Sequence, residues 1–250
     1  FFFLAPQWLQ YVHRLDSLET ALWLLPVAVG IGPASAAGPA LLEKLGPGRL
    51  AGLGMALMAM ATGALAAQAG GGQALWVFAA TLIVFGFGFG LAITPGTTLI
   101  IGGLPDDRRT LSAAVNDVTR EVGGALGGAV AASVLIAVYA QDLSTGLADS
   151  RIPASAEQTA EDGVAQALAI SGDLGRDGAQ LMSTAVEAFA NGYGTALWVA
   201  TSALLVGAAA SVLGARRKTH PNTVARYPAA GQVPCRPTQT REGSQPLSPR

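Results

Sequence analysis

Residues 50–105 read LAGLGMALMAMATGALAAQAGGGQALWVFAATLIVFGFGFGLAITPGTTLIIGGLP and contain no Asp, Glu, Lys, Arg or His. A water-soluble fold of this size does not accommodate so long an uncharged stretch, because most of its surface must face water. A helix of about 20 residues crosses a hydrocarbon layer of about 30 Å. The stretch is therefore long enough for two membrane spans, with the glycines of Gly70–Gly72 at the turn between them.

The composition of the whole chain is also typical of a membrane protein. Hydrophobic residues make up 51% of the 250 residues and charged residues 12%, which is about half of the charged fraction usual in soluble domains. The single cysteine, Cys235, and two distant histidines offer no disulfide, metal site or nucleophile. We therefore expect no enzyme activity and no cofactor.

Uncharged segments of span length recur along the chain. The first apolar segment lacks an initiator Met and a preceding basic region, and we interpret it as the end of a helix that begins upstream. The predicted spans are 1–12 (partial), 20–42, 50–69, 74–101, 118–141 and 188–215. The predicted fold is all-α, a polytopic transmembrane helical bundle over residues 1–218 with five full spans and one partial span. An acidic extracytoplasmic loop at 142–187 and a disordered tail at 219–250 complete the prediction.

Prolines and small residues indicate where these spans should bend or pack closely. Pro33 and Pro95 each remove a backbone donor, which a bilayer tolerates only where neighbouring helices or waters satisfy the freed carbonyl. Small side chains allow two helix backbones to approach each other. The glycines expected at close crossings or bends are Gly86, Gly88, Gly90, Gly123, Gly124, Gly127 and Gly128.

The distribution of Lys and Arg predicts the orientation, because cytoplasmic loops carry an excess of both residues. One side holds Lys44, Arg49, Arg108, Arg109, Arg120, Arg216, Arg217 and Lys218, and the other holds Arg14, Arg151 and Arg176. Eight against three predicts that the first set and the C-terminal tail are cytoplasmic, and that the acidic loop lies outside.

The order of several motifs resembles the fourteen-span drug/proton antiporters of the major facilitator superfamily, the EmrB/QacA group, over residues 1 to about 216. Residues 46–49, from Gly46 to Arg49, resemble the short cytoplasmic turn between two helices of the C-terminal half. The most specific match is to the family's Gly-rich helix and the start of the helix after it. It is carried by Gly86, Phe87, Gly88, Phe89, Gly90, Pro95, Pro105, Asn116, Arg120, Gly123, Gly124 and Gly127.

This resemblance implies the C-terminal half of a secondary transporter in the plasma membrane, with proton-coupled multidrug efflux as the leading hypothesis. The expected partners are the lipid bilayer, a small lipophilic or cationic substrate exchanged for protons, and the missing N-terminal half, with no nucleic acid. Two alternatives stay open: a major facilitator for another small solute, such as a metabolite or siderophore, and a truncated membrane fragment that transports nothing.

Asn116, Arg120 and Glu121 are the candidates for a gate or for the substrate and proton pathway. A cation one turn before the Gly123 ladder must reach the cytoplasmic interface or pair with a nearby acid. An interface anchor or gate clasp is the favoured interpretation of Arg120, and a direct role in transport stays open. No acid lies in the middle of a predicted span, so a proton carrier is expected in the missing half.

Overall fold

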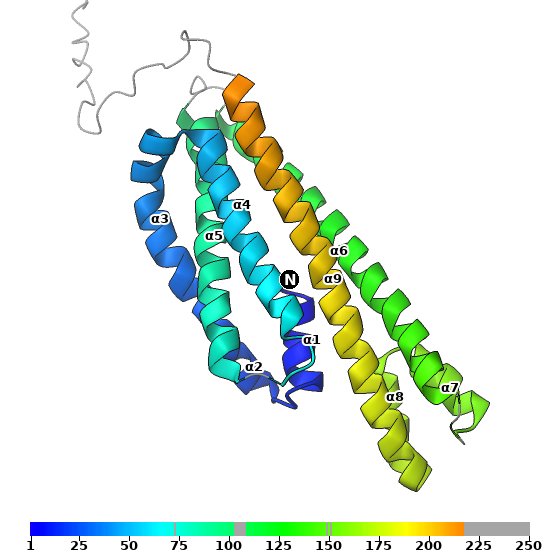
Figure 1. Ribbon diagram of the computed structural model, residues 1–250. Coiled ribbons are helices and arrows are strands. Elements are labelled where there is room, and N and C mark those ends of the chain that lie inside the picture. Colours follow the sequence, from blue (N-terminus) through cyan, green and yellow to red (C-terminus); the bar gives the residue numbers. More distant parts are fainter. Residues whose placement is uncertain (73, 103–108, 149, 151, 218–250) are drawn as a thin grey trace, which may run out of the picture. The chain divides into compact units, whose positions relative to one another are not determined.

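The computed structural model describes residues 1–72, 74–102, 109–148, 150 and 152–217 (Figure 1). Every regular element in this part of the chain is a helix, which confirms the predicted all-α class. The longer helices are α3 (Pro26–Leu45), α4 (Pro47–Ala67), α5 (Leu75–Gly102), α6 (Arg109–Leu147) and α9 (Gly175–Arg217). The shorter elements are α1 (Leu4–Tyr11), α2 (Ser17–Leu24), α7 (Ala154–Glu161), α8 (Val164–Ser171) and the 3-10 turn η1 (Gly172–Leu174).

Within the described residues, five helical stretches are long and apolar enough to cross a membrane. They are Ser17–Leu45, Pro47–Ala67, Leu75–Pro95, Ala114–Leu147 and Asp177–Ala215. The protein is therefore a multi-pass membrane helical bundle. The exact limits of the spans stay predictions, as does the side of the membrane on which each end lies.

The first of these stretches is two helices, α2 and α3, which follow each other with a break at Leu25. Asp16 begins α2 with a capping box: its carboxylate accepts from the Glu19 amide at 2.7 Å, and the Glu19 carboxylate accepts from the Asp16 amide at 3.2 Å. Pro26 then opens α3, because proline fits the first helical position but cannot donate to the turn before it.

A glycine with positive φ turns the chain from α3 into α4. Gly46 has φ +76°, a conformation that side-chain-bearing residues rarely adopt, and Pro47 follows at the first position of α4. Because this connection is a single residue, the end of α3 and the start of α4 lie next to each other. The tight turn that sequence resemblance predicts at Gly46–Arg49 is therefore the place where α3 ends and α4 begins.

Glycines bring α3, α4 and α5 into backbone contact. A Cβ atom on Gly30 of α3 would clash with backbone atoms of Ile83 and Phe87 on α5. On the other side of α5, a Cβ atom on Gly54 of α4 would lie 2.5 Å from the Ala92 nitrogen. Such distances leave no space for a methyl group, so these glycines set how closely the helices cross.

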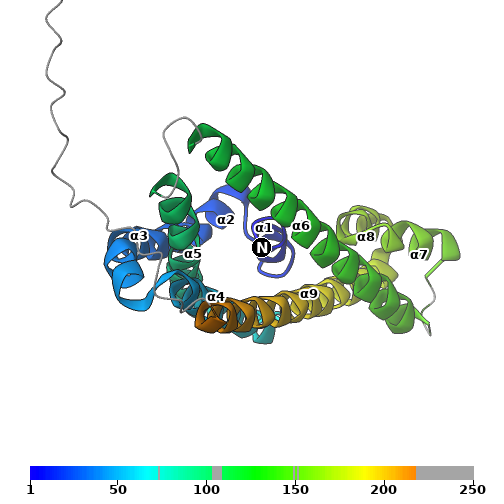
Figure 2. The same cartoon turned by 90° about the horizontal axis from the view of Figure 1, so that it is seen from above.

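The short helix α1 lies in the space bordered by α5, α6 and α9 (Figure 2). Its Trp8 is 2% exposed, and the indole stacks on Phe78 of α5 at 5.2 Å and on Tyr193 of α9 at 5.6 Å between ring centroids. The indole Nε1 donates to the carbonyl of Ala69, just after α4, at 2.7 Å. One side chain thus connects four segments of the bundle.

Helices α6 and α9 run beside each other, with α7 and α8 at one end of the pair (Figure 1). They contain 39 and 43 residues, or about 58 Å and 64 Å at 1.5 Å per residue. Both continue into the 142–187 segment that the sequence assigns to a loop, because α6 ends at Leu147 and α9 begins at Gly175. Polar residues end the apolar pattern there, but they do not end the backbone hydrogen bonding of a helix.

Several residues of the sequence predictions lie outside the described part. They are Pro105, Arg108, Arg151, Lys218 and the tail at 219–250.

Candidate functional site

The three polar candidates lie in the N-terminal half of α6. Nη2 of Arg120 is 3.4 Å from Oδ1 of Asp117, and the two side chains are 57% and 63% exposed. Glu121 is exposed as well, and Asn116 is half-buried. Among the described residues, the side chain of Arg120 has no hydrogen bond to either of these candidates. The structure therefore pairs Arg120 with Asp117, and its role in gating stays a prediction.

The glycine ladder that follows has no neighbour in the described part of the chain. A Cβ atom on Gly123, Gly124, Gly127 or Gly128 would meet nothing within 4 Å. Residues 121–130 are all exposed, including Val122, Leu126 and Val130. In a membrane protein this apolar face must meet lipid or another part of the protein. We call residues 121–130 the open face of α6.

The glycines predicted in α5 are in the opposite situation, because all three lie at helix crossings. A Cβ atom on Gly86 would clash with the Val27 backbone of α3, and one on Gly90 would lie 2.7 Å from the Ala34 Cβ atom. One on Gly88 would lie 2.7 Å from the Gly54 carbonyl of α4.

The predicted prolines and turn residues also have defined positions. Pro33 lies inside α3 on an exposed side, and Pro95 is buried inside α5. Helix continues on both sides of each proline. Gly46 lies between α3 and α4, and Arg49 is exposed in the first turn of α4.

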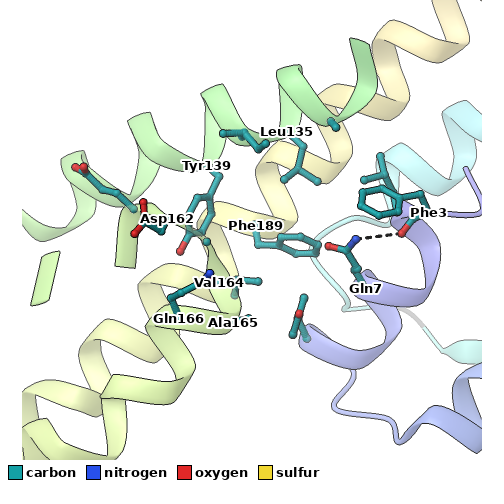
Figure 3. A pocket seen from close by; sticks show the side chains of 15 residues that line it. Phe3, Gln7, Leu135, Tyr139, Asp162, Val164, Ala165, Gln166 and Phe189 are labelled. Atoms are coloured by element: carbon teal, nitrogen blue, oxygen red, sulfur yellow. Dashed lines mark hydrogen bonds between the residues drawn. The ribbon is translucent and has the colours of Figure 1, made fainter. Parts of the chain in front are cut away.

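A groove that sequence reasoning missed lies between α1, α6, α9 and the turn from α7 to α8 (Figure 3). Its volume is about 240 Å³. Aromatic side chains from three segments line it: Phe3 and Tyr11 at the two ends of α1, Tyr139 of α6, and Phe189 of α9. Residues 161–166 close one end. We call this space the outer groove, following the predicted orientation.

A buried hydrogen bond holds the α7–α8 turn against α6. The Tyr139 hydroxyl donates to the carbonyl of Ala160 at 2.8 Å, and both residues are buried. Glu161 and Asp162 follow directly and are exposed at the rim of the groove. In the described part of the chain neither carboxylate has a hydrogen bond or an ion pair. The lining contains no Lys or Arg, so the charge of the lining residues themselves is net negative.

Two basic side chains follow α1, but neither lines the groove. The guanidinium of Arg14 is directed at the sulfur of Met182, 3.9 Å away. The ring of His13 packs edge-on against Trp8 at 4.6 Å, and burial lowers the pKa of this histidine below its usual value. Burial therefore favours the neutral form of His13.

The described residues contain no group of three or more His, Cys, Asp or Glu side chains that could hold a metal ion. The groove has aromatic walls and two carboxylates, and its lining contains no reacting group beside them. Its residues are therefore suited to binding a molecule.

Comparisons with known proteins identify the family. The family model of the Major Facilitator Superfamily matches residues 1–128. The methyl viologen resistance protein SmvA of Salmonella typhimurium is 29% identical over 209 residues, which cover 81% of this chain and 40% of that protein. The tetracenomycin C resistance and export protein of Streptomyces glaucescens is 26% identical over 244 residues, which cover 93% of this chain and 43% of that protein.

The chain thus spans about two fifths of the length of these curated relatives. The narrower assignment to the fourteen-span EmrB/QacA group stays a prediction. The match over half of the chain and the bundle of apolar helices agree with each other, and the chain belongs to the major facilitator superfamily.

Proposed function

We propose that this chain is the C-terminal half of a secondary transporter that exports small lipophilic or cationic compounds across the plasma membrane. The observation that carries the proposal is the similarity to a resistance protein and to a resistance and export protein over 81% and 93% of the chain. The five apolar helical stretches support the same function. We propose no enzyme activity.

In this proposal the substrate is held near the middle of the bilayer, between this half and an N-terminal half. Alternating access then comes from rocking of one half against the other. The tight crossings of α3, α4 and α5 favour movement of these three helices as one body, because their backbones are in contact. The open face of α6 is an exposed apolar surface that can meet the other half.

The proposal includes proton exchange and a cytoplasmic tail. The absence of acids from the centres of the predicted spans favours a proton carrier in the N-terminal half. The excess of Lys and Arg near one set of span ends supports a cytoplasmic location for that side and for the tail.

Efflux by the full-length gene product tests the proposal. Expression in a bacterial strain that lacks its own multidrug pumps should lower ethidium accumulation and raise resistance to cationic compounds. Unchanged accumulation and resistance, with the protein present in the membrane, would contradict export of such compounds. Efflux that persists after a protonophore has collapsed the proton gradient would contradict proton coupling alone.

The 250 residues expressed alone provide the matching control. Without an N-terminal half they should enter the membrane but leave ethidium accumulation unchanged. Export by this chain alone would contradict the proposal that the substrate is held between two halves.

A further inference from the structure

We infer that the outer groove binds the aromatic part of a flat, lipophilic organic cation, with Glu161 and Asp162 supplying the attraction for its charge. The location of the groove on the outer side of the membrane rests on the proposed function. Binding itself does not depend on transport, so it can be measured separately.

The size of the groove fits part of a drug-sized molecule. Pockets that enclose such molecules usually have volumes of about 300–1,000 Å³. The outer groove, at about 240 Å³, has room for a few fused rings. It is open on one side, so the remaining substituents of a larger ligand would stay in water.

The walls are aromatic, and the ring at the centre is held in place. Phe189 is 2% exposed, and Tyr11 packs edge-on against its ring at 5.4 Å and 85°. Phe3, by contrast, is 66% exposed at the edge of the groove. Aromatic rings attract cations over their faces and pack against flat ligands. Phe3 therefore offers an accessible ring to a planar aromatic guest, and the buried Phe189 forms the apolar floor of the groove.

The charge of the rim selects a cation. Glu161 and Asp162 have no counter-ion in the described residues, and the hydrogen bond from Tyr139 to Ala160 fixes the backbone just before them. At the α1 side, the Gln7 amide nitrogen donates to the carbonyl of Phe3 at 3.2 Å, while its oxygen is directed toward Phe189 (Figure 3). Acceptors therefore lie at both sides of the aromatic walls, and the lining itself contains no Lys or Arg that would compete with a positively charged guest.

The groove and the proposed transport surface lie on the same helix, α6. Val130, at the end of the open face, is 54% exposed, and Ile136, which lines the groove on the same helix, is 60% exposed.

Equilibrium binding of ethidium to the full-length protein in detergent tests the inference. Ethidium fluorescence should titrate to saturation with the wild-type protein, and the double variant Glu161→Gln/Asp162→Asn should raise the Kd roughly tenfold. The matched control is Glu157→Gln/Asp173→Asn, which removes two carboxylates from the same segment outside the groove. It should leave the Kd within about twofold, because those charges are screened by water and salt.

Absence of ethidium binding by the wild-type protein would overturn the inference. So would equal weakening in the two double variants, because the effect would then come from the overall charge of the segment.

Protection of a single cysteine locates the bound cation without removing an acid. In a background from which every native cysteine, Cys235 included, has been replaced by serine, Ala165→Cys places a thiol in the lining, and Asp173→Cys places one outside it. Saturating ethidium should slow maleimide labelling at position 165 and leave labelling at position 173 unchanged. Equal labelling rates at position 165 with and without ethidium would overturn the inference, even if the acidic variants fail to fold.

The two proposals fail in different ways. If cells do not export ethidium but position 165 is protected, the proposed function is contradicted and cation binding in the outer groove is supported. Export of ethidium without protection of position 165 would contradict cation binding in the outer groove but would still support the proposed function.

Discussion

The glycines of α5 and those of α6 both form rows of small residues, but their surroundings are opposite. Gly86 and Gly88 lie where a single methyl group would meet the backbone of α3 or α4. Gly123 and Gly127 have nothing within 4 Å of the same position. A row of small residues therefore indicates that a helix can be approached closely, but it does not tell whether the approaching helix belongs to the same half of the protein.

The largest expected loss of stability comes from adding one methyl group to a glycine of α5 that packs against another helix. Gly86→Ala should lower the free energy of unfolding by about 2 kcal/mol or more, because backbone atoms cannot move aside as a flexible side chain can. Thermal unfolding in detergent, followed by the loss of monodisperse protein, measures the change.

The matched control on the open side is Gly127→Ala. Its Cβ atom meets nothing, and alanine is favoured over glycine inside a helix by about 1 kcal/mol, so this variant should be as stable as the wild type or more stable. Equal midpoints for both alanine variants would break the contrast between the two helices.

A bulky residue on the open face should affect transport and leave stability unchanged. Gly127→Leu should reduce ethidium efflux roughly tenfold, because a leucine there would separate α6 from the other half of the transporter. Efflux from intact cells, normalised to the amount of protein in the membrane, gives the measurement. Full efflux by this variant would indicate that the face contacts lipid.

The packing of α1 against its neighbours also depends on one buried hydrogen bond, from Trp8 to the carbonyl of Ala69. Trp8→Phe keeps an aromatic ring but leaves the Ala69 carbonyl without its donor, and it should destabilise the protein by about 1 kcal/mol. Tyr193→Phe is the control, since the Tyr193 hydroxyl is buried with no hydrogen-bond partner in the described residues. The same unfolding assay should place Tyr193→Phe at or above the wild type, and a larger loss there than for Trp8→Phe would contradict this assignment.

The smallest effect is expected at the Arg120–Asp117 pair on the open side. Asp117→Asn should change the free energy of unfolding by less than about 0.5 kcal/mol, because both side chains are well exposed. Arg120→Lys should retain efflux, since either cation can reach the membrane interface. If this lysine variant loses efflux at normal stability, the Arg120 guanidinium group has a direct role in the transport path. An interface anchor would not be sensitive to this change.

The sequence is a good guide to the fold where hydrophobicity alone decides it. The uncharged residues 50–105 predict two long helices, and the structure has α4 and α5 there. The ends of α6 and α9 could not be predicted in this way, because Asp142 and Glu187 interrupt the apolar pattern without interrupting the helix. An α-helix satisfies its own backbone in water as well as in lipid, so charge indicates the edge of the membrane more reliably than the end of a helix.

The site is harder to predict for a related reason. Tyr139, Glu161 and Phe189 are distant in the sequence, and only packing of α7 and α8 against α6 and α9 brings them to one groove. The sequence shows Glu161 as one acid among several in a polar segment. The hydrogen bond from Tyr139 to Ala160, which places that acid at the rim, is a tertiary contact with no local pattern.

The great length of α6 and α9 has a mechanical consequence. Each exceeds the hydrocarbon thickness by about 30 Å, so a substantial part of this helix pair must project beyond the apolar layer. A stiff rod of about 58 Å that tilts by about 10° around one end displaces its other end by about 10 Å. A small rotation of the pair at one membrane surface thereby produces a large displacement at the opposite end. The helices α7 and α8 lie at one end of this pair and would move with it.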